Sequence, residues 1–129
     1  MVLDLLKQDR HSIGYKVAVW PAHYQSNQQW RFEKRGPNTY VIRSRWNGQV
    51  LDVYKNQRVY GSCYRVGTWR AHYGSNQLWS VEKRGSRYVI RSRSTGRILD
   101  VFMGEVALGS GRRVGVCRAH YRSNQLWRL

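Results

Sequence analysis

The sequence is poor in several features that would mark it as a member of a large protein class. Its 129 residues include only two cysteines, Cys63 and Cys117, too few for the disulfide framework of a small secreted scaffold. The two fall at different points of the internal repeat described below, so we expect them to be unpaired. No run of about 18 apolar residues is present, which excludes a membrane-spanning helix.

Other absences concern targeting and fold class. The N-terminal segment MVLDLLKQDR lacks the apolar stretch of a secretory signal peptide, which leaves the cytoplasm or release by a non-classical route as alternatives. Prolines number only two against twelve glycines, and long helical stretches are missing. The β-branched and aromatic residues favour strands. We therefore expect one all-β domain over residues 1–129 with a small core.

Acidic residues are scarce. Seven Asp and Glu stand against 23 Lys and Arg, which gives a formal net charge of +16. Such a surface attracts polyanions, among them nucleic acid, sulfated or sialylated glycans and anionic membranes. The basic residues are spread along the chain rather than clustered, so a solvated surface without a dedicated polyanion partner is an equal alternative.

Catalytic signatures are also missing. The sequence has no phosphate-binding glycine loop, no HExxH and no paired metal-binding cysteines. A carboxylate pair for glycoside hydrolysis would have to combine aspartates from different repeats, which symmetry places far apart. We expect no catalytic residues, no metal ion and no cofactor.

What the sequence does contain is one unit repeated three times. AHYxSNQxW ends at residues 30, 79 and 127, and residues 40–53 and 88–101 share YVIRSRxxGxxLDV. Asp4, Asp52 and Asp100 follow one another at intervals of 48 residues. The approximate repeats are 1–36, 37–85 and 86–129, with no linker between them.

Each unit predicts short strands joined by turns. LDV and VxVW are strands, AHYxSN is a polar turn, another strand runs from QxW to EKRG, and YVIRS is the fourth. The NG or TG that follows starts a hairpin back into LDV. One unit cannot bury its own apolar face, so the three must share a core with pseudo-threefold symmetry. At the C-terminal end only QLWRL is present, so one of twelve expected strands is missing, and we expect a homodimer to meet the open edge.

The three Gln-x-Trp motifs in fixed register, each preceded by an LDV-type aspartate strand, resemble the ricin B-type (R-type) lectins over essentially the whole chain. Small leaderless lectins of marine invertebrates such as mussels are similar in size and layout. The resemblance implies a β-trefoil, a barrel capped by three hairpins, with one potential sugar site per unit. It also implies galactose or N-acetylgalactosamine as ligand, and the basic surface adds tolerance for sialylated, ganglioside-type chains.

Two departures from the family pattern bear on the sites. The cysteine that often precedes Leu-Asp is replaced by Val50 and Ile98, so the usual disulfides within repeats are missing. The aromatic residue that ends the second strand is Trp20 and Trp69 in the first two units but Cys117 in the third. We therefore expect two good sites and one weaker site, unless Tyr121 or His120 supplies the ring surface of the third.

A sugar offers hydroxyl groups and an apolar face of C–H groups, so its site needs a carboxylate, amides and an aromatic ring. Each candidate also has a structural alternative: a strand-end aspartate, a core tryptophan, an SNQ turn, or a turn histidine that supports the following tyrosine. Trp30, Trp79 and Trp127 are assigned to the core. The candidate site residues are Asp4, Trp20, His23, Asn27 and Gln28 in the first unit, Asp52, Trp69, His72, Asn76 and Gln77 in the second, and Asp100, His120, Asn124 and Gln125 in the third.

The sequence thus predicts a non-catalytic lectin for cell-surface glycoproteins or glycolipids, with no specific nucleic-acid partner and no membrane insertion. The alternative is a basic β-trefoil that binds heparin or nucleic acid. Its affinity would fall steeply with salt, whereas binding of a neutral sugar would not.

Overall fold

Ten strands and three single-turn 3₁₀ helices form the part of the chain that the structure, a computed structural model, describes, namely residues 1–106 and 111–129. The strands are β1 (Val2–His11), β2 (Gly14–Trp20), β3 (Trp30–Gly36), β4 (Thr39–Ser44), β5 (Val50–Val59), β6 (Cys63–Trp69), β7 (Trp79–Arg84), β8 (Arg87–Ser92), β9 (Ile98–Val106) and β10 (Arg112–Cys117). The 3₁₀ helices are η1 (Ser26–Gln28), η2 (Ser75–Gln77) and η3 (Ser123–Gln125). No described helix has the length or apolar character needed to cross a membrane.

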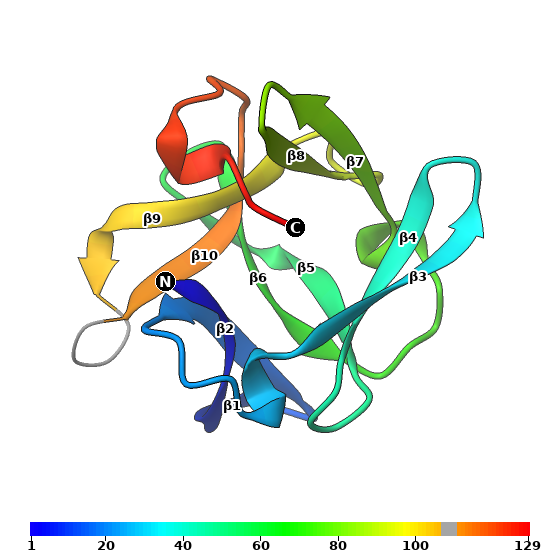
Figure 1. Ribbon diagram of the computed structural model, residues 1–129. Coiled ribbons are helices and arrows are strands. Elements are labelled where there is room, and N and C mark those ends of the chain that lie inside the picture. The colour runs from blue at the N-terminus through cyan, green and yellow to red at the C-terminus, as the bar shows by residue number, and fades with distance from the viewer. Residues whose placement is uncertain (107–110) are drawn as a thin grey trace.

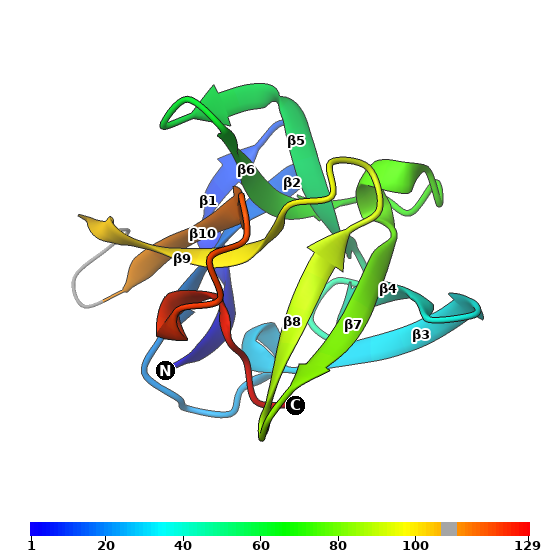
Figure 2. The ribbon, with the colours of Figure 1, turned by 90° about the horizontal axis from the view of Figure 1, so that it is seen from above.

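The strands are arranged with the threefold layout of a β-trefoil, which confirms the predicted fold. β1–β2, β5–β6 and β9–β10 are antiparallel pairs, and β2, β6 and β10 also pair with one another, which closes the barrel. β3–β4 and β7–β8 form hairpins on one side of these strands (Figures 1 and 2). The predicted AHYxSN turn ends in the 3₁₀ helix, and the next strand starts at the tryptophan of QxW.

Strand alternation explains why the leucine and valine of the LDV motif face the core while the aspartate between them faces the other side of the strand. In β5, Leu51 and Val53 point into the shared core and are 0% and 1% exposed. Asp52, between them, points to the opposite face. The other two units repeat this pattern, so the core is filled by equivalent aliphatic residues from all three.

The tryptophans of the QxW motifs pack as core residues. Trp79 is fully buried, whereas Trp30 and Trp127 are partly buried and pack against the core. Each indole N–H donates to the backbone carbonyl that precedes the motif aspartate, with N–O distances of 3.0 Å for Trp30 to Leu3, 3.2 Å for Trp79 to Leu51 and 3.1 Å for Trp127 to Leu99. These bonds attach the start of each hairpin to the barrel.

The expectation that the cysteines are unpaired is wrong. Cys63 and Cys117 form a disulfide, with Cα atoms 4.4 Å apart. They occupy different points of the repeat, but threefold symmetry brings the first residue of β6 in one unit against the last residue of β10 in the next. The other two copies of this junction hold glycine–tryptophan contacts, Gly14 with Trp69 and Gly111 with Trp20.

The strand count predicted for the third unit is also wrong. QLWRL forms no strand, and Trp127 makes only an isolated bridge to Tyr88. This bridge matches the pairing of Trp79 with Tyr40, but in the described residues no partner strand gives Trp30 the same pairing. In the described residues no third hairpin follows η3 (Figure 1), and an open groove lies beside η3 and the start of β1. Its apolar lining includes Leu3, Trp30, Phe32, Ile42, Ile90, Leu99, Val101, Leu126 and Trp127.

Trp79→Phe should destabilise the domain more than Trp127→Phe. Both changes remove the indole hydrogen bond, but only Trp79 is fully enclosed, so its replacement also leaves a cavity. We expect a loss of about 2–3 kcal/mol for Trp79→Phe and about 1 kcal/mol for Trp127→Phe in the free energy of unfolding. Urea denaturation measures both. Equal losses would contradict the difference in burial.

Candidate carbohydrate-binding sites

The aspartate of each LDV strand lies beneath the AHYxSNQ turn, where two amides hold its carboxylate. In the second unit, Asn76 Nδ2 donates to Asp52 Oδ1 at 3.1 Å and Gln77 Nε2 donates to Oδ2 at 2.9 Å. The corresponding distances are 3.1 and 2.8 Å from Asn27 and Gln28 to Asp4, and 3.2 and 2.8 Å from Asn124 and Gln125 to Asp100. The structure therefore brings the predicted aspartate, asparagine and glutamine together in all three units.

The glutamine also ties the turn to the strand. Gln77 Oε1 accepts the backbone N–H groups of His72 and Tyr73, and its Nε2 donates a second bond to the carbonyl of Arg70. Gln28 and Gln125 make the same four contacts in their units. Because both polar atoms of each of these glutamine amides are bonded, the position of the glutamine and that of the carboxylate are fixed before any ligand arrives.

The histidine of each turn faces the aspartate from the solvent side. His72 Nδ1 accepts the N–H of Gly74 at 2.9 Å, so the protonated Nε2 points towards Asp52 and lies 3.9 Å from Oδ2. His23 and His120 repeat this geometry, with Nε2 3.6 Å from Asp4 and 3.9 Å from Asp100. Between 36% and 50% of these side chains is exposed. Each histidine thus stabilises the turn and also lies at the edge of the site.

Trp20 and Trp69 share a face of the sheet with the aspartates. Asp52 pairs across the strands with Gly67, and Trp69 lies two residues further along β6 on the same side. The ring is partly exposed, but it also packs on Gly14 and has its centroid 6.1 Å from that of Tyr54. The two tryptophans therefore combine a packing role with a position suited to a ligand.

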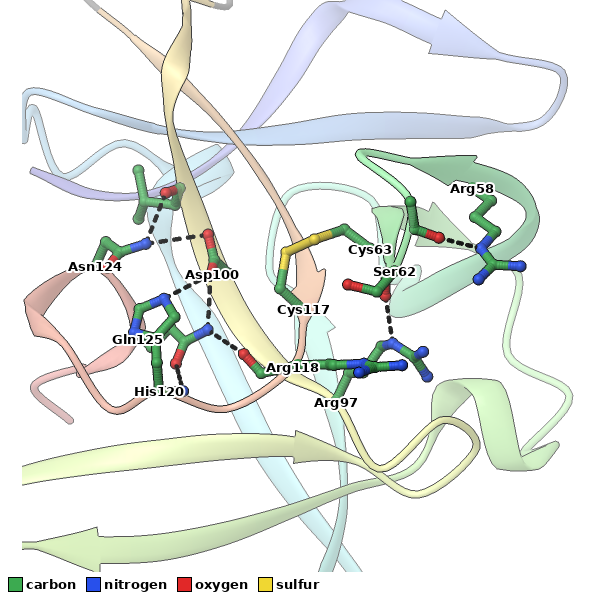
Figure 3. The surroundings of a disulfide bond; sticks show 12 residues. Arg58, Ser62, Cys63, Arg97, Asp100, Cys117, Arg118, His120, Asn124 and Gln125 are labelled. Atoms are coloured by element: carbon green, nitrogen blue, oxygen red, sulfur yellow. Dashed lines mark hydrogen bonds and ion pairs between the residues drawn. A yellow bond between two sulfur atoms is a disulfide. The ribbon is translucent and has the colours of Figure 1, made fainter.

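The third unit differs at this position. Cys117 replaces the ring, and a small pocket opens beside the aspartate, lined by Tyr60, Asp100, Phe102, Met103 and Cys117. Figure 3 shows Asp100 with its amide partners on one side and the disulfide on the other. The aromatic residues here come from β9 and from the turn that precedes β6, which the repeat pattern alone did not indicate.

Burial changes the acid–base properties of the site. It raises the pKa of Asp52 and that of Asp100, while the glutamine hydrogen bond and the nearby histidine act in the opposite direction. These carboxylates therefore take up a proton at a higher pH than an ordinary aspartate. A protonated carboxyl group loses acceptor capacity, so acid should weaken any ligand that binds through it.

Sequence reasoning missed the tyrosine that follows each histidine. Tyr24, Tyr73 and Tyr121 have positive φ angles of 62°, 62° and 61°, an unfavourable backbone conformation for a bulky residue. The glutamine that accepts their N–H groups holds this turn. The available signal was the repetition of the turn AHYxSN in all three units, which differ here only at the residue after the tyrosine.

Tyr73 and Tyr121 also connect neighbouring units. The guanidinium of Arg35 lies 3.8 Å from the Tyr73 ring centroid, and Arg43 donates to the Tyr73 hydroxyl at 3.2 Å. Arg84 and Arg91 contact Tyr121 in the same way, at 3.8 and 3.0 Å. Arg43 and Arg91 further pair with Glu33 and Glu82. These arginines lie on the barrel exterior but are engaged in contacts between units.

The chain matches a protein family along most of its length. The profile of the ricin-type beta-trefoil lectin domain-like family matches residues 2–69 and 26–115. The chain belongs to this family. A comparison with curated proteins finds no match.

Solved structures share the fold of this lectin-like domain. A designed threefold symmetric protein, ThreeFoil, is 28% identical with a TM-score of 0.84, over 98% of this chain and 87% of its own. The exo-β-1,3-galactanase 1,3Gal43A from Clostridium thermocellum is 23% identical with a TM-score of 0.84, over 98% of this chain. The Polyporus squamosus lectin bound to Neu5Acα2-6Galβ1-4GlcNAc is 24% identical with a TM-score of 0.77, over 97% of this chain. The chain spans only 27% of the galactanase and 42% of the Polyporus lectin.

The lectin-like domain shows no metal centre in residues 1–106 and 111–129, where no three His, Cys, Asp or Glu side chains cluster as ligands. The three histidines are separated by the threefold arrangement, each beside its own aspartate.

Gln77→Glu should make the stability of this lectin-like domain depend on pH. The new carboxylate lies against Asp52, whose pKa burial already raises, so the pair shares a proton in the folded state. Stability is then present at low pH and is lost as pH rises. We expect a loss of about 1–3 kcal/mol at neutral pH that shrinks towards about pH 4.5.

Urea midpoints at both pH values measure this effect. Gln29→Glu is the matched control, because Gln29 is exposed and its side-chain amide donates to the Tyr24 carbonyl, away from any carboxylate. A Gln77→Glu loss that does not change with pH would show that the two carboxylates are not coupled.

Proposed function

We propose that the chain is a non-catalytic lectin that binds glycans containing galactose or N-acetylgalactosamine through Asp4, Asp52 and Asp100. The observation that supports this most strongly is the threefold recurrence of a buried, amide-held carboxylate beside a half-exposed histidine. In the family to which the chain belongs, the domain is a lectin domain.

The geometry suits a pyranose. Each carboxylate oxygen accepts one side-chain amide bond and keeps a lone pair for a sugar hydroxyl. The histidine Nε2–H adds a donor at the edge, and Trp20 or Trp69 offers an apolar surface for the C–H face. Each direct hydrogen bond contributes about 1–2 kcal/mol after water is displaced.

Three sites in one small domain favour a surface that displays many copies of the ligand, such as cell-surface glycoproteins or glycolipids. The net charge of +16 favours acidic glycans among these. The Polyporus lectin, which shares the fold, is described with a sialylated galactose trisaccharide. We therefore propose that sialylated chains are accepted beside neutral ones.

A second candidate, binding of heparin or nucleic acid, rests on the charge alone. Polyanion binding needs no carboxylate, and the arginines Arg43 and Arg91 are already paired with glutamates. Salt separates the two functions, because affinity for a polyanion falls steeply with ionic strength and affinity for a neutral sugar does not.

Single replacement of Asp4, Asp52 or Asp100 by Ala should each remove one binding site for methyl β-galactoside. Titration calorimetry at two salt concentrations, with the melting temperature recorded for each variant, measures the loss. We expect stoichiometry to fall by one site per variant, with affinity nearly independent of salt. Unchanged stoichiometry in folded variants would rule out the aspartate sites, and salt-sensitive binding of heparin without galactoside binding would support the alternative.

We also propose a homodimer in which two copies cover each other's open groove. Three of the most exposed large apolar side chains, Met1, Met103 and Leu129, are 67%, 66% and 62% exposed and line this groove. The strand edge at Trp30 lies there too. A twofold arrangement places identical grooves against each other and removes this surface from water.

The dimer should have twice the 15.3 kDa mass of one chain in sedimentation at micromolar concentration. Because Arg87, Arg112 and Arg128 also line the groove, salt should strengthen association by screening their repulsion. Leu129→Arg should shift the protein to monomer, because it adds a positive charge beside these arginines, whereas the same change at Tyr24, an exposed residue outside the groove, should not. A monomer at every salt concentration would contradict the proposal.

A further inference from the structure

We propose that the third sugar site takes its aromatic surface from Tyr60 of the preceding unit, and that the Cys63–Cys117 disulfide positions this residue. The inference rests on the proposed lectin function and deepens it for Asp100. The sequence leads to the opposite expectation, a weakened third site, because Cys117 stands where the other units have tryptophan.

The pocket beside Asp100 contains the elements of a sugar site. Its lining combines the carboxylate with the rings of Tyr60 and Phe102 and the side chains of Met103 and Cys117. Asp100 lies at one wall, held by Asn124 and Gln125 from the other side. A ligand hydroxyl can approach the carboxylate while the apolar face of the sugar meets an aromatic ring.

Tyr60 is the ring best placed to meet the ligand. It is 64% exposed, whereas Phe102 is 5% exposed and serves as its support. The two rings meet edge to face, with centroids 5.3 Å apart and an interplanar angle of 89°. This contact fixes the orientation of an exposed ring, so little conformational entropy is lost when a sugar binds to it.

Three attachments hold the turn that carries Tyr60 (Figure 3). Arg58 donates to the Gly61 carbonyl and Arg97 donates to the Ser62 carbonyl. Cys63, three residues after Tyr60, is bonded to Cys117 at the end of β10. The disulfide is the covalent link between the Tyr60 turn and β10, whose Gly115 pairs with Asp100 of β9, so it limits the width of the pocket.

The second site shows why the replacement by cysteine matters. The residue equivalent to Tyr60 is His11, whose ring centroid lies 5.1 Å from that of Tyr54 and 6.4 Å from that of Trp69. There the large Trp69 ring fills the space beside the strand, and Gly14 makes room for it. At the third site both members of this contact are cysteines, Cys63 of the second unit and Cys117 of the third, so the ring is absent and the pocket beside Asp100 is open.

The test isolates the third site in a chain that carries Asp4→Ala and Asp52→Ala. Tyr60→Ala and Tyr60→Phe are compared in this background by titration with methyl β-galactoside. We expect Tyr60→Ala to weaken binding about tenfold because the ring surface is lost, and Tyr60→Phe to bind like the parent. Parent-like binding by Tyr60→Ala would overturn the assignment.

A matched control uses the symmetry of the chain. His11→Ala, at the equivalent position of the first unit, should leave binding at the Asp52 site within twofold in an Asp4→Ala, Asp100→Ala background, because Trp69 remains there. A tenfold loss from His11→Ala would show that any change in these turns disturbs the neighbouring site, and the specific role of Tyr60 would be wrong.

The positioning role of the disulfide is tested by replacing both cysteines with serine in the wild-type background. Binding at the third site should weaken severalfold while the Asp4 and Asp52 sites keep their affinities, since no other site uses this turn. Equal weakening at all three sites would indicate a general loss of structure and contradict the proposal. Absence of galactoside binding at the Asp4 and Asp52 sites of the wild-type chain would instead refute the lectin function itself, and this inference with it.

Discussion

A buried carboxylate held by two side-chain amides is the interaction on which the rest of this molecule depends. In every unit it joins the LDV strand of the barrel to the 3₁₀ turn ahead of the QxW tryptophan. The same glutamine holds the His-Tyr turn, in which the tyrosine has a positive φ angle. An unpaired carboxylate at this depth would cost several kcal/mol, so the cluster forms as a whole. Fold and candidate site are therefore built from the same bonds.

The symmetry of the chain is broken at two places, the junction of the second and third units and the segment after η3. The Cys63–Cys117 bond replaces a glycine–tryptophan contact, and the hairpin after η3 is absent from the described residues. The first change opens a pocket beside Asp100, and the second leaves an apolar groove with exposed Met103 and Leu129 at its margin. The departures from the repeat therefore lie where the surface of the molecule differs from one unit to another.

Much of this structure could be predicted from the sequence, because the internal repeat determines the number of units and the position of each strand. Equal spacing of the aspartates and of the QxW motifs predicts three equivalent units, and strand alternation places Asp52 opposite Leu51 and Val53. The disulfide could not be predicted this way, since spacing within a repeat says nothing about contacts between neighbouring units around an axis. The Arg35–Tyr73 contact and the Tyr60–Phe102 contact could not be predicted either. Both depend on the direction of side chains where two neighbouring units meet. The segment QLWRL is predicted to form a strand, but a strand needs a partner strand. Among the described residues, Trp127 of this segment makes an isolated bridge with Tyr88.

The side-chain amide resonances of the site residues offer the most direct measurement of the central claim. Asn76, Gln77, Asn124 and Gln125 hold the carboxylates, so their NH₂ signals in two-dimensional NMR report any ligand that bonds to Asp52 or Asp100. Titration with methyl β-galactoside should shift these signals saturably, at both low and high salt. If they stay fixed while backbone signals of the arginine-rich exterior respond to heparin, the carboxylate clusters are structural and the account of the sites is wrong.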